Sequence, residues 1–417
     1  MKILHLSAFD GEGGAARAAG RLHRGLLVKQ LESWMAVRRK GKDSKNVKQC
    51  GSEGKLGKLI SLLRPYIDAL PLVLFRNKKN VPWSIAWLPN KLGVIQLKIA
   101  PDIVHVHWVG TGFLSLGNLS RTKTKMIWTL HDAWPFTGGC HIINECTAFK
   151  KSCGVCPQLG SETKHDLSWF GWRRKQQLYR NQQIVFVAPS RWIAEQARSS
   201  SLLSNFQIEI IPNGLDTNVF QPIDKKLARE LLGLPHDKKI ILFGAMSATD
   251  DPNKGFDKLK NALSHFKQFG LGDEIELAVF GSSEPFDKPE LGFRTTYLGR
   301  YHDDISLTAV YSAADVMCVP SIQESFGQTA TESMSCGTPV VAFATSGLLD
   351  IVDHGVSGYL AKPYDEVDFA KGIKSLVNDE SNLNKMSIEA RKKAVECFDI
   401  SFVTSKYMDL YKRVVLS

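Results

Sequence analysis

The stretch that decides the fold is Val319-Pro-Ser-Ile-Gln-Glu-Ser-Phe-Gly-Gln-Thr-Ala-Thr-Glu332. It reads as the end of a buried strand, a turn containing Gly327 and the start of a helix. A helix N-terminus at the carboxyl edge of a parallel sheet attracts an anionic phosphate. Glu324 is then placed to reach a sugar hydroxyl, and Glu332 to accept both hydroxyls of a ribose. A plain surface helix with early glutamates would show the same spacing, so the rest of the chain must decide.

Short apolar runs alternate with helical patterns along the chain, which is typical of a parallel α/β sheet. The runs that predict buried strands are Lys2–Ser7, Ile103–His107, Met126–Leu130, Gln183–Ala188, Ile208–Ile211, Lys239–Phe243, Ile275–Phe280, Asp315–Val319 and Pro339–Phe343. Two further prolines after a Pro-Asn-Gly turn break the pattern within Leu215–Pro235. We therefore expect two Rossmann-like domains, 1–218 and 219–397, with a last helix, 398–417, that packs back on the first.

The length and the charge of the chain narrow the function. At 417 residues the chain exceeds one ordinary core, so two domains with a cleft between them are expected. The net charge is +11, and residues 1–100 hold 19 Lys+Arg against 6 Asp+Glu, whereas the rest holds 34 against 36. Such a one-sided field suits an anionic partner, namely a phospholipid surface, a polyanion or a phosphate-bearing acceptor. No motif for binding nucleic acid accompanies it.

The sequence contains no run of about 18 apolar residues, and Met1–Phe9 lacks the apolar core of a signal peptide. We expect a cytoplasmic protein. The leucine-rich segment Lys55–Lys79 is interrupted by charges and prolines, so it can lie on a bilayer but not cross it. It predicts peripheral contact with the inner face of a membrane. An irregular helical pair packed on its own domain would have the same pattern.

Six motifs occur in an order and in strand-helix positions that belong together. They are Gly11-Glu-Gly-Gly14, Thr129-Leu-His131-Asp132, Ile211-Pro-Asn-Gly-Leu-Asp216, Lys254-Gly255, Tyr311-Ser-Ala-Ala-Asp315 and the E-S-F-G-x4-E block. With them the chain resembles the retaining family 4 glycosyltransferases of the GT-B fold. The segment Trp128–Leu159 is similar to the subset that builds bacterial capsule, colanic-acid or O-antigen-type polysaccharides.

The resemblance implies roles for individual residues. His131 would contact the donor sugar near the reacting carbon, Glu324 its hydroxyls, Glu332 the ribose, and Lys254 the diphosphate. The backbones of Gly13 and Gly14 would approach phosphates or acceptor closely. The remaining donor-binding residues would be Ser325, Phe326, Gly327, Gln328 and Thr329. The donor would be a UDP- or GDP-sugar. The transfer would be front-face attack without a catalytic metal, and Glu324 is a nucleophile candidate by residue type only.

One cation of the family pattern is missing. The family commonly has an Arg just after the strand that here ends at Gly244, whereas this chain has Ala245-Met246. A departing nucleoside diphosphate develops negative charge, so its stabilisation is the main demand on the site. Either Lys254 and the backbone of Gly327–Thr329 suffice, or Arg17 or Arg300 substitutes, or activity is low.

Four of the eight cysteines lie within seventeen residues: Cys140, Cys146, Cys153 and Cys156. The last two form a C-x2-C pair, which is typical of a zinc site. A structural zinc that orders the loop after His131 is expected. Unmetallated thiols and two disulfides are the alternatives, since the first two spacings fit no standard zinc module.

The sequence as a whole predicts a hexosyltransferase that acts on a glycan or polyprenyl-diphosphate-linked acceptor in bacterial surface polysaccharide synthesis. The alternatives are a nucleotide-sugar 2-epimerase and a weakly active sugar-nucleotide binder that serves as an assembly partner. A dinucleotide-dependent oxidoreductase is disfavoured, because Gly11-Glu-Gly-Gly14 does not match G-x-G-x-x-G.

Overall fold

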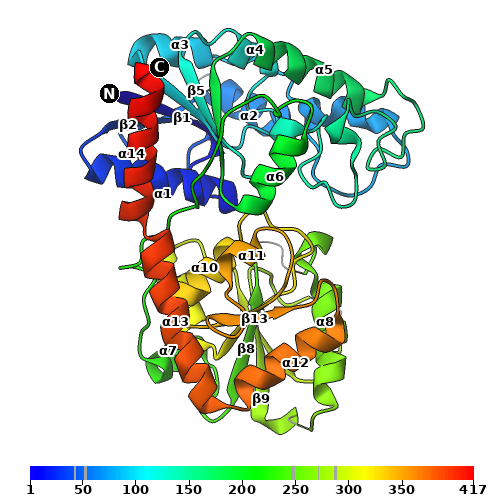
Figure 1. The fold of residues 1–417 in the computed structure, drawn as a ribbon, viewed down its shortest axis with the longest axis vertical. Coiled ribbons are helices and arrows are strands. Elements are labelled where there is room, and N and C mark those ends of the chain that lie inside the picture. Colours follow the sequence, from blue (N-terminus) through cyan, green and yellow to red (C-terminus); the bar gives the residue numbers. More distant parts are fainter. Residues whose placement is uncertain (42–43, 51–53, 246–248, 271, 286–288) are drawn as a thin grey trace. The chain divides into compact units, whose positions relative to one another are not determined.

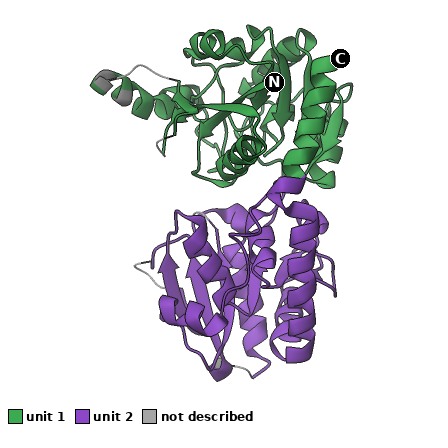
Figure 2. Ribbon diagram, turned by 90° about the vertical axis from the view of Figure 1, so that its left-hand side faces the viewer, with its two compact units in different colours: residues 1–212, 403–417 green, residues 213–402 purple. Residues whose placement is uncertain are grey.

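The computed structural model describes residues 1–41, 44–50, 54–245, 249–270, 272–285 and 289–417, and these form two compact units. Unit 1 comprises residues 1–212 and 403–417, and unit 2 comprises residues 213–402 (Figure 2). Both ends of the chain therefore belong to unit 1. The sequence places the domain boundaries at residues 218 and 397, a few residues from these limits.

The sheet of unit 1 has seven parallel strands in the order β3-β2-β1-β4-β5-β6-β7 (Figure 1). The strands are β1 (Lys2–Phe9), β2 (Glu32–Arg39), β3 (Val47–Gln49), β4 (Ile103–Val106), β5 (Lys125–Thr129), β6 (Ile184–Ala188) and β7 (Ile208–Ile210). Every strand predicted for the first half lies in this sheet. Strands β2 and β3 were not predicted, because β2 begins and ends with charged residues and β3 has three residues.

Helices cover both faces of this sheet. They are α1 (Gly14–Val28), α2 (Gly54–Ala69), α3 (Leu92–Ile99), α4 (Leu116–Ser120), α5 (Leu167–Arg180), α6 (Arg191–Ser199) and α14 (Ile400–Leu416). On one face, Ile3, Ile103 and Ile127 form a core with Leu22 and Leu26 of α1 and with five residues of α14. The α14 residues are Val403, Tyr407, Leu410, Tyr411 and Val414. The C-terminal helix thus packs back on the first sheet, as predicted.

Unit 2 repeats the architecture with six parallel strands in the order β10-β9-β8-β11-β12-β13. The strands are β8 (Lys239–Gly244), β9 (Ile275–Phe280), β10 (Arg294–Gly299), β11 (Val316–Val319), β12 (Val340–Phe343) and β13 (Gly358–Ala361). The helices are α7 (Lys225–Leu232), α8 (Phe256–Lys267), α9 (Asp304–Ala313), α10 (Gln328–Ser335), α11 (Leu348–Ile351), α12 (Glu366–Val377) and α13 (Glu380–Phe398). Two parallel Rossmann-like sheets confirm the predicted fold class.

In helix α2 and the 3-10 turn η1 (Leu70–Leu74) of unit 1, Arg64, Asp68 and Leu72 point inward. Arg64 donates to the carbonyls of Gly112, Leu88 and Pro89, and the buried Asp68 accepts from the backbone N–H of Trp87. Nine apolar side chains are exposed and form what we call the α2 surface: Leu59, Ile60, Leu62, Leu63, Tyr66, Ile67, Leu70, Val73 and Leu74. This is the reverse of an ordinary surface helix.

Exposed basic side chains occur on either side of the α2 surface in the sequence. Lys55 precedes it, Arg76 and Lys79 follow it, Lys91 precedes α3, and Lys98 lies in the last turn of α3. Across the described residues, no helix combines the length and apolarity that crossing a bilayer requires.

Candidate functional site

The carboxyl edge of the unit 2 sheet holds the loop that leads from β11 to α10. The loop is fixed through its backbone: the N–H of Glu324 donates to Ser346 Oγ at 2.9 Å, and the N–H of Gly347 donates to the carbonyl of Glu324 at 2.8 Å. Gly327 precedes α10 with φ +117°, a conformation that favours glycine. The first backbone N–H groups of α10 are thereby placed at the sheet edge, as the sequence predicts.

Two predicted residues meet in this loop. Lys254 Nζ lies 2.7 Å from Glu324 Oε1, and Ser321 donates to the same oxygen at 3.0 Å. Burial disfavours the charge on Lys254, but Glu324 raises its pKa above the ordinary value. Both side chains are partly exposed, at 24% and 17%. A fixed cation-carboxylate pair with some access to solvent can bind a diphosphate on one side and hydroxyls on the other.

The loop that carries Lys254 is bound to the Glu324 loop at two points. Asn253 Nδ2 donates to the carbonyl of Gln323, and the N–H of Ile322 donates to the carbonyl of Asn253. Asp251 accepts from the N–H of Asn253 and so caps the 3-10 turn Pro252–Lys254. At Gly255, φ is +71° and an added Cβ would lie 2.0 Å from the carbonyl oxygen of Pro320. Only glycine permits this approach.

Glu332 lies deeper than its predicted role suggests. It is 3% exposed, and one of its oxygens accepts from Tyr311 OH of α9 at 2.8 Å. The Tyr311-to-Asp315 motif thus holds Glu332 in place. Phe326 is buried against Phe398, whereas the remaining donor-binding candidates of this loop, Ser325, Gln328 and Thr329, are partly exposed.

Neither arginine named as a substitute for the missing Arg lies in these two loops. Ala245 directly follows β8, and Met246 lies outside the described residues. Arg300 is exposed directly after β10, and Arg17 lies on α1 of unit 1.

In unit 1, Gly13 and Gly14 stand where β1 passes into α1. Gly13 is the N-cap of α1 with φ +88°, and its carbonyl accepts from the N–H of Arg17. Gly14 is exposed. The start of α1 therefore presents backbone without side chains at these two residues.

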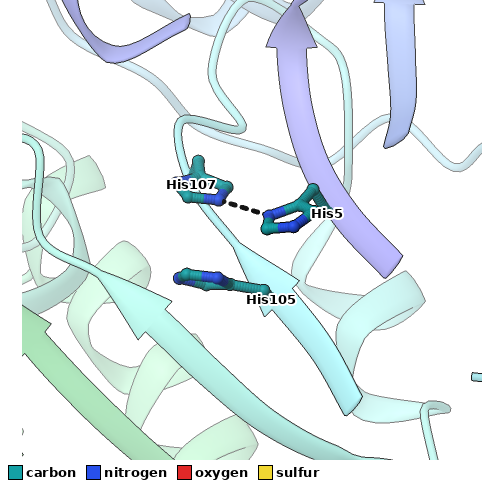
Figure 3. Close-up of side chains that lie close together, drawn as sticks. All are labelled: His5, His105 and His107. Carbon is teal, nitrogen blue, oxygen red and sulfur yellow. Dashed lines mark hydrogen bonds between the residues drawn. The ribbon is translucent and has the colours of Figure 1, made fainter. Parts of the chain in front are cut away.

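His131 follows β5 and belongs to a hydrogen-bonded row of histidines. Its Nε2 lies 3.0 Å from Nδ1 of His107, and Nε2 of His107 lies 2.9 Å from Nδ1 of His5 (Figure 3 shows the second contact). Burial lowers the pKa of His131 to about 4, and lowers those of His5 and His107 well below their usual value. These rings are neutral at pH 7.

A second polar pair lies beside His131. Asp132 Oδ2 is 2.6 Å from Nδ1 of His141 and accepts from Trp108 Nε1 at 2.8 Å. Burial opposes the charge on Asp132, but His141 and the backbone N–H of Trp134 lower its pKa overall. Together with His107 and His131, these residues line a small pocket.

The buried histidines His5, His105 and His107 were missed in the sequence. The signal was present, because His5 and His105 stand opposite each other in neighbouring strands and His105 and His107 are two residues apart, so all three point to one face. Each offers a nitrogen within 4.8 Å of the others, which is the geometry of a possible metal site. His105 is engaged elsewhere: it pairs with Tyr411 OH at 2.7 Å and Thr129 Oγ1 at 2.8 Å.

The four clustered cysteines line one pocket of unit 1, between Trp83 and Phe149. All four are free thiols, so no disulfide joins them. Burial raises the pKa of Cys140 and of Cys153 to about 12. In the described part of the chain, no three of these sulfur atoms approach within 4.8 Å of one another, so the pocket gathers the thiols without the spacing of a closed zinc site.

These sites and the two parallel sheets define a two-domain α/β enzyme class that handles sugar nucleotides, and comparison with known proteins agrees. Residues 12–219 match the model described as Glycosyltransferase Family 4, and residues 224–393 match Glycosyl transferases group 1. The chain belongs to this superfamily of GT-B glycosyltransferases.

Individual relatives are more distant. A D-inositol 3-phosphate glycosyltransferase of Stackebrandtia nassauensis is 36% identical over 187 residues, which cover 42% of this chain and 41% of that protein. The chain thus aligns with less than half of that relative's length. Sucrose-phosphate synthase of Thermosynechococcus elongatus has a TM-score of 0.71 at 19% identity, covering 99% of both chains. Anabaena HepE, in complex with UDP-glucose, has a TM-score of 0.66 at 18% identity, covering 99% of this chain and all of that one. These two show the shared fold.

Proposed function

We propose that the chain is a retaining hexosyltransferase that takes its sugar from a UDP- or GDP-sugar bound in unit 2. The observation that carries the proposal is the Lys254–Glu324 pair beside the start of α10. A diphosphate would replace Glu324 as the partner of Lys254 and would accept from the α10 N–H groups, which frees Glu324 for the sugar hydroxyls. The UDP-glucose bound by Anabaena HepE, which shares the fold, supports this class of donor.

Calorimetric melting in the presence of UDP, GDP, ADP or NAD tests the donor site. We expect one nucleoside diphosphate, at about 100 Kd, to raise the Tm of unit 2 by about 5–10 °C. The shift should be lost in Lys254→Ala and in Glu332→Gln. The matched control is Lys258→Ala, because Lys258 forms an equivalent ion pair with Glu366 in the same unit. A Tm shift with NAD alone would contradict the proposal, and so would the absence of a shift with every nucleoside diphosphate.

The acceptor is proposed to be a glycan or a polyprenyl-diphosphate-linked glycan of a bacterial surface polysaccharide, bound by unit 1. The motifs of Trp128–Leu159 and the basic N-terminal quarter support this choice. The name of the Stackebrandtia relative makes inositol phosphate the first competing acceptor to include in an assay. The anomeric configuration of the product, read by NMR, separates retention from inversion.

Two alternatives are separated by the same assay. Donor converted without acceptor would indicate a 2-epimerase, which the two family matches do not favour. Tight donor binding without turnover on any acceptor would indicate an assembly partner.

A structural zinc at Cys140, Cys146, Cys153 and Cys156 remains our proposal for the cysteine pocket. Free thiols that line one apolar pocket support it. Metal analysis of purified protein, before and after thiol modification, decides between zinc and free thiols.

A further inference from the structure

The row His5–His107–His131 joins the buried sheet to the partly exposed end of β5. His5 and His107 are 0% and 3% exposed, whereas His131 is partly exposed and lines the pocket beside Trp134. Neighbouring rings in the row are 5.2 and 5.3 Å apart, tilted by 24° and 27°. His131 Nδ1 has no hydrogen bond with the described residues, so it is the open end of the row.

The protons of such a row are coupled. Each neutral imidazole has one N–H and one bare nitrogen, so each of the two contacts has one donor and one acceptor. If His5 donates from Nδ1, then His107 accepts at Nε2 and must donate from Nδ1. His131 then accepts at Nε2 and carries its own proton on Nδ1. Reversing one contact requires reversing the other.

The closed end of the row decides the direction. Nε2 of His5 is buried and has no hydrogen-bond partner. The reverse direction would place an N–H there without an acceptor, and buried unpaired N–H groups are the rarer defect in proteins. The favoured direction leaves only a bare nitrogen at that point.

We propose that His5 and His107 are positioning residues that hold His131 as the tautomer with its proton on Nδ1. His131 then presents a hydrogen-bond donor, and not an acceptor, to an oxygen atom of the bound ligand. The identity of the ligand rests on the proposed function, because the oxygen atom belongs to the donor sugar or the acceptor. The assignment of the His131 tautomer does not rest on the proposed function.

Histidine side-chain nitrogen NMR of the full chain, labelled with ¹⁵N-histidine, tests the tautomer directly. We expect His131, assigned through His131→Asn, to show a protonated Nδ1 and a bare Nε2. His5→Phe should turn His131 into a mixture of tautomers, although His5 does not touch it. His107→Asn keeps a donor at the δ position and should retain the Nδ1–H form, whereas His107→Phe should lose it.

The control is His105→Phe, because His105 is equally buried and its ring centre lies 4.1 Å from that of His107, but it is outside the row. It should leave the His131 tautomer unchanged. In the transfer assay, His5→Phe should lower kcat roughly tenfold with KM unchanged. A wild type without transferase activity would refute the proposed function but leave the NMR result intact.

A protonated Nε2 on His131 in the wild type would overturn the proposal. So would a tautomer that stays unchanged in His5→Phe, since the row would then have no influence. Stoichiometric transition metal in the purified protein, with histidine signals that move on chelation, would overturn it as well, because His5, His105 and His107 would then be ligands.

Discussion

At the scale of single residues, His23 of α1 makes unit 1 sensitive to acid. It is 3% exposed and pairs with Ser33 Oγ at 2.7 Å, and burial lowers its pKa to about 4. The unfolded chain binds the proton near pH 6.5, so the stabilisation is complete above that pH and is lost as the pH falls towards 4. Between pH 7 and pH 5 the free energy of unfolding should fall by about 2 kcal/mol from His23 alone.

Tryptophan fluorescence measures this effect, because all nine tryptophans lie in residues 34–192 and report on unit 1. The free energy of unfolding, obtained from denaturation curves, differs between pH 7 and pH 5, and this difference should be smaller by about 2 kcal/mol in His23→Gln than in wild type. The exposed His165→Gln is the control. An equal acid sensitivity in wild type and His23→Gln would refute the assignment.

Residues were predictable where a motif fixes them. Glu324 was expected at the site from a strand end and a helix start, and Lys254 from the family resemblance, and their side chains lie 2.7 Å apart in the structure. The burial of Glu332 under Tyr311 was not expected, since the contact joins two helices and leaves no local pattern. The histidine row was also missed. The two-residue spacing of His105 and His107 was visible in the sequence, but their position opposite His5 follows from the pairing of β1 with β4.

At the scale of elements, the segment Lys55–Lys79 was expected either to lie on a membrane or to form an irregular helical pair packed on its own domain. It contains α2 and η1, whose orientation was not predictable. A pattern of apolar and polar residues does not say which face turns inward when Arg64 and Asp68 find backbone partners. The exposed α2 surface, with basic residues on either side of it in the sequence, supports our proposal of a peripheral contact with an anionic membrane.

Co-sedimentation with vesicles tests the α2 surface. We expect wild type to bind vesicles rich in anionic lipid at low salt, and Leu62→Ser/Leu63→Ser/Leu70→Ser to bind at least about tenfold more weakly. The control changes three exposed apolar residues of unit 2: Leu227→Ser/Leu231→Ser/Ile388→Ser. Unchanged binding by the α2 variant would refute the contact, and dimerisation lost in that variant would assign the surface to a second copy.

At the scale of the whole molecule, the fold class was predictable, and the packing of α14 on the first sheet can be tested. The buried strands of both sheets follow from runs of apolar residues, whereas the edge strands β10 and β13 were not found because they are short or half-exposed. Helix α14 supplies Tyr407 and Tyr411 to the buried face of the first sheet, where they bond Thr129 and His105.

Truncation should show how much unit 1 depends on α14. A chain of residues 1–402 exposes Ile3, Ile103 and Ile127, so we expect it to lose the cooperative tryptophan-fluorescence transition or to aggregate. A chain of residues 1–415 lacks only the last two residues and should unfold like wild type. A sharp transition in the shorter chain would mean that unit 1 is complete without the helix.

The position of α14 at the end of the chain also sets an order of events during translation. The strands of unit 1 leave the ribosome first, yet the helix that seals their apolar face emerges only after residues 213–402 have been made. At about 5–20 residues per second this interval lasts about 10–40 s. For that time α1 alone covers this face of the nascent sheet, and the apolar side chains that α14 will bury are open to chaperones that bind apolar segments at the ribosomal exit.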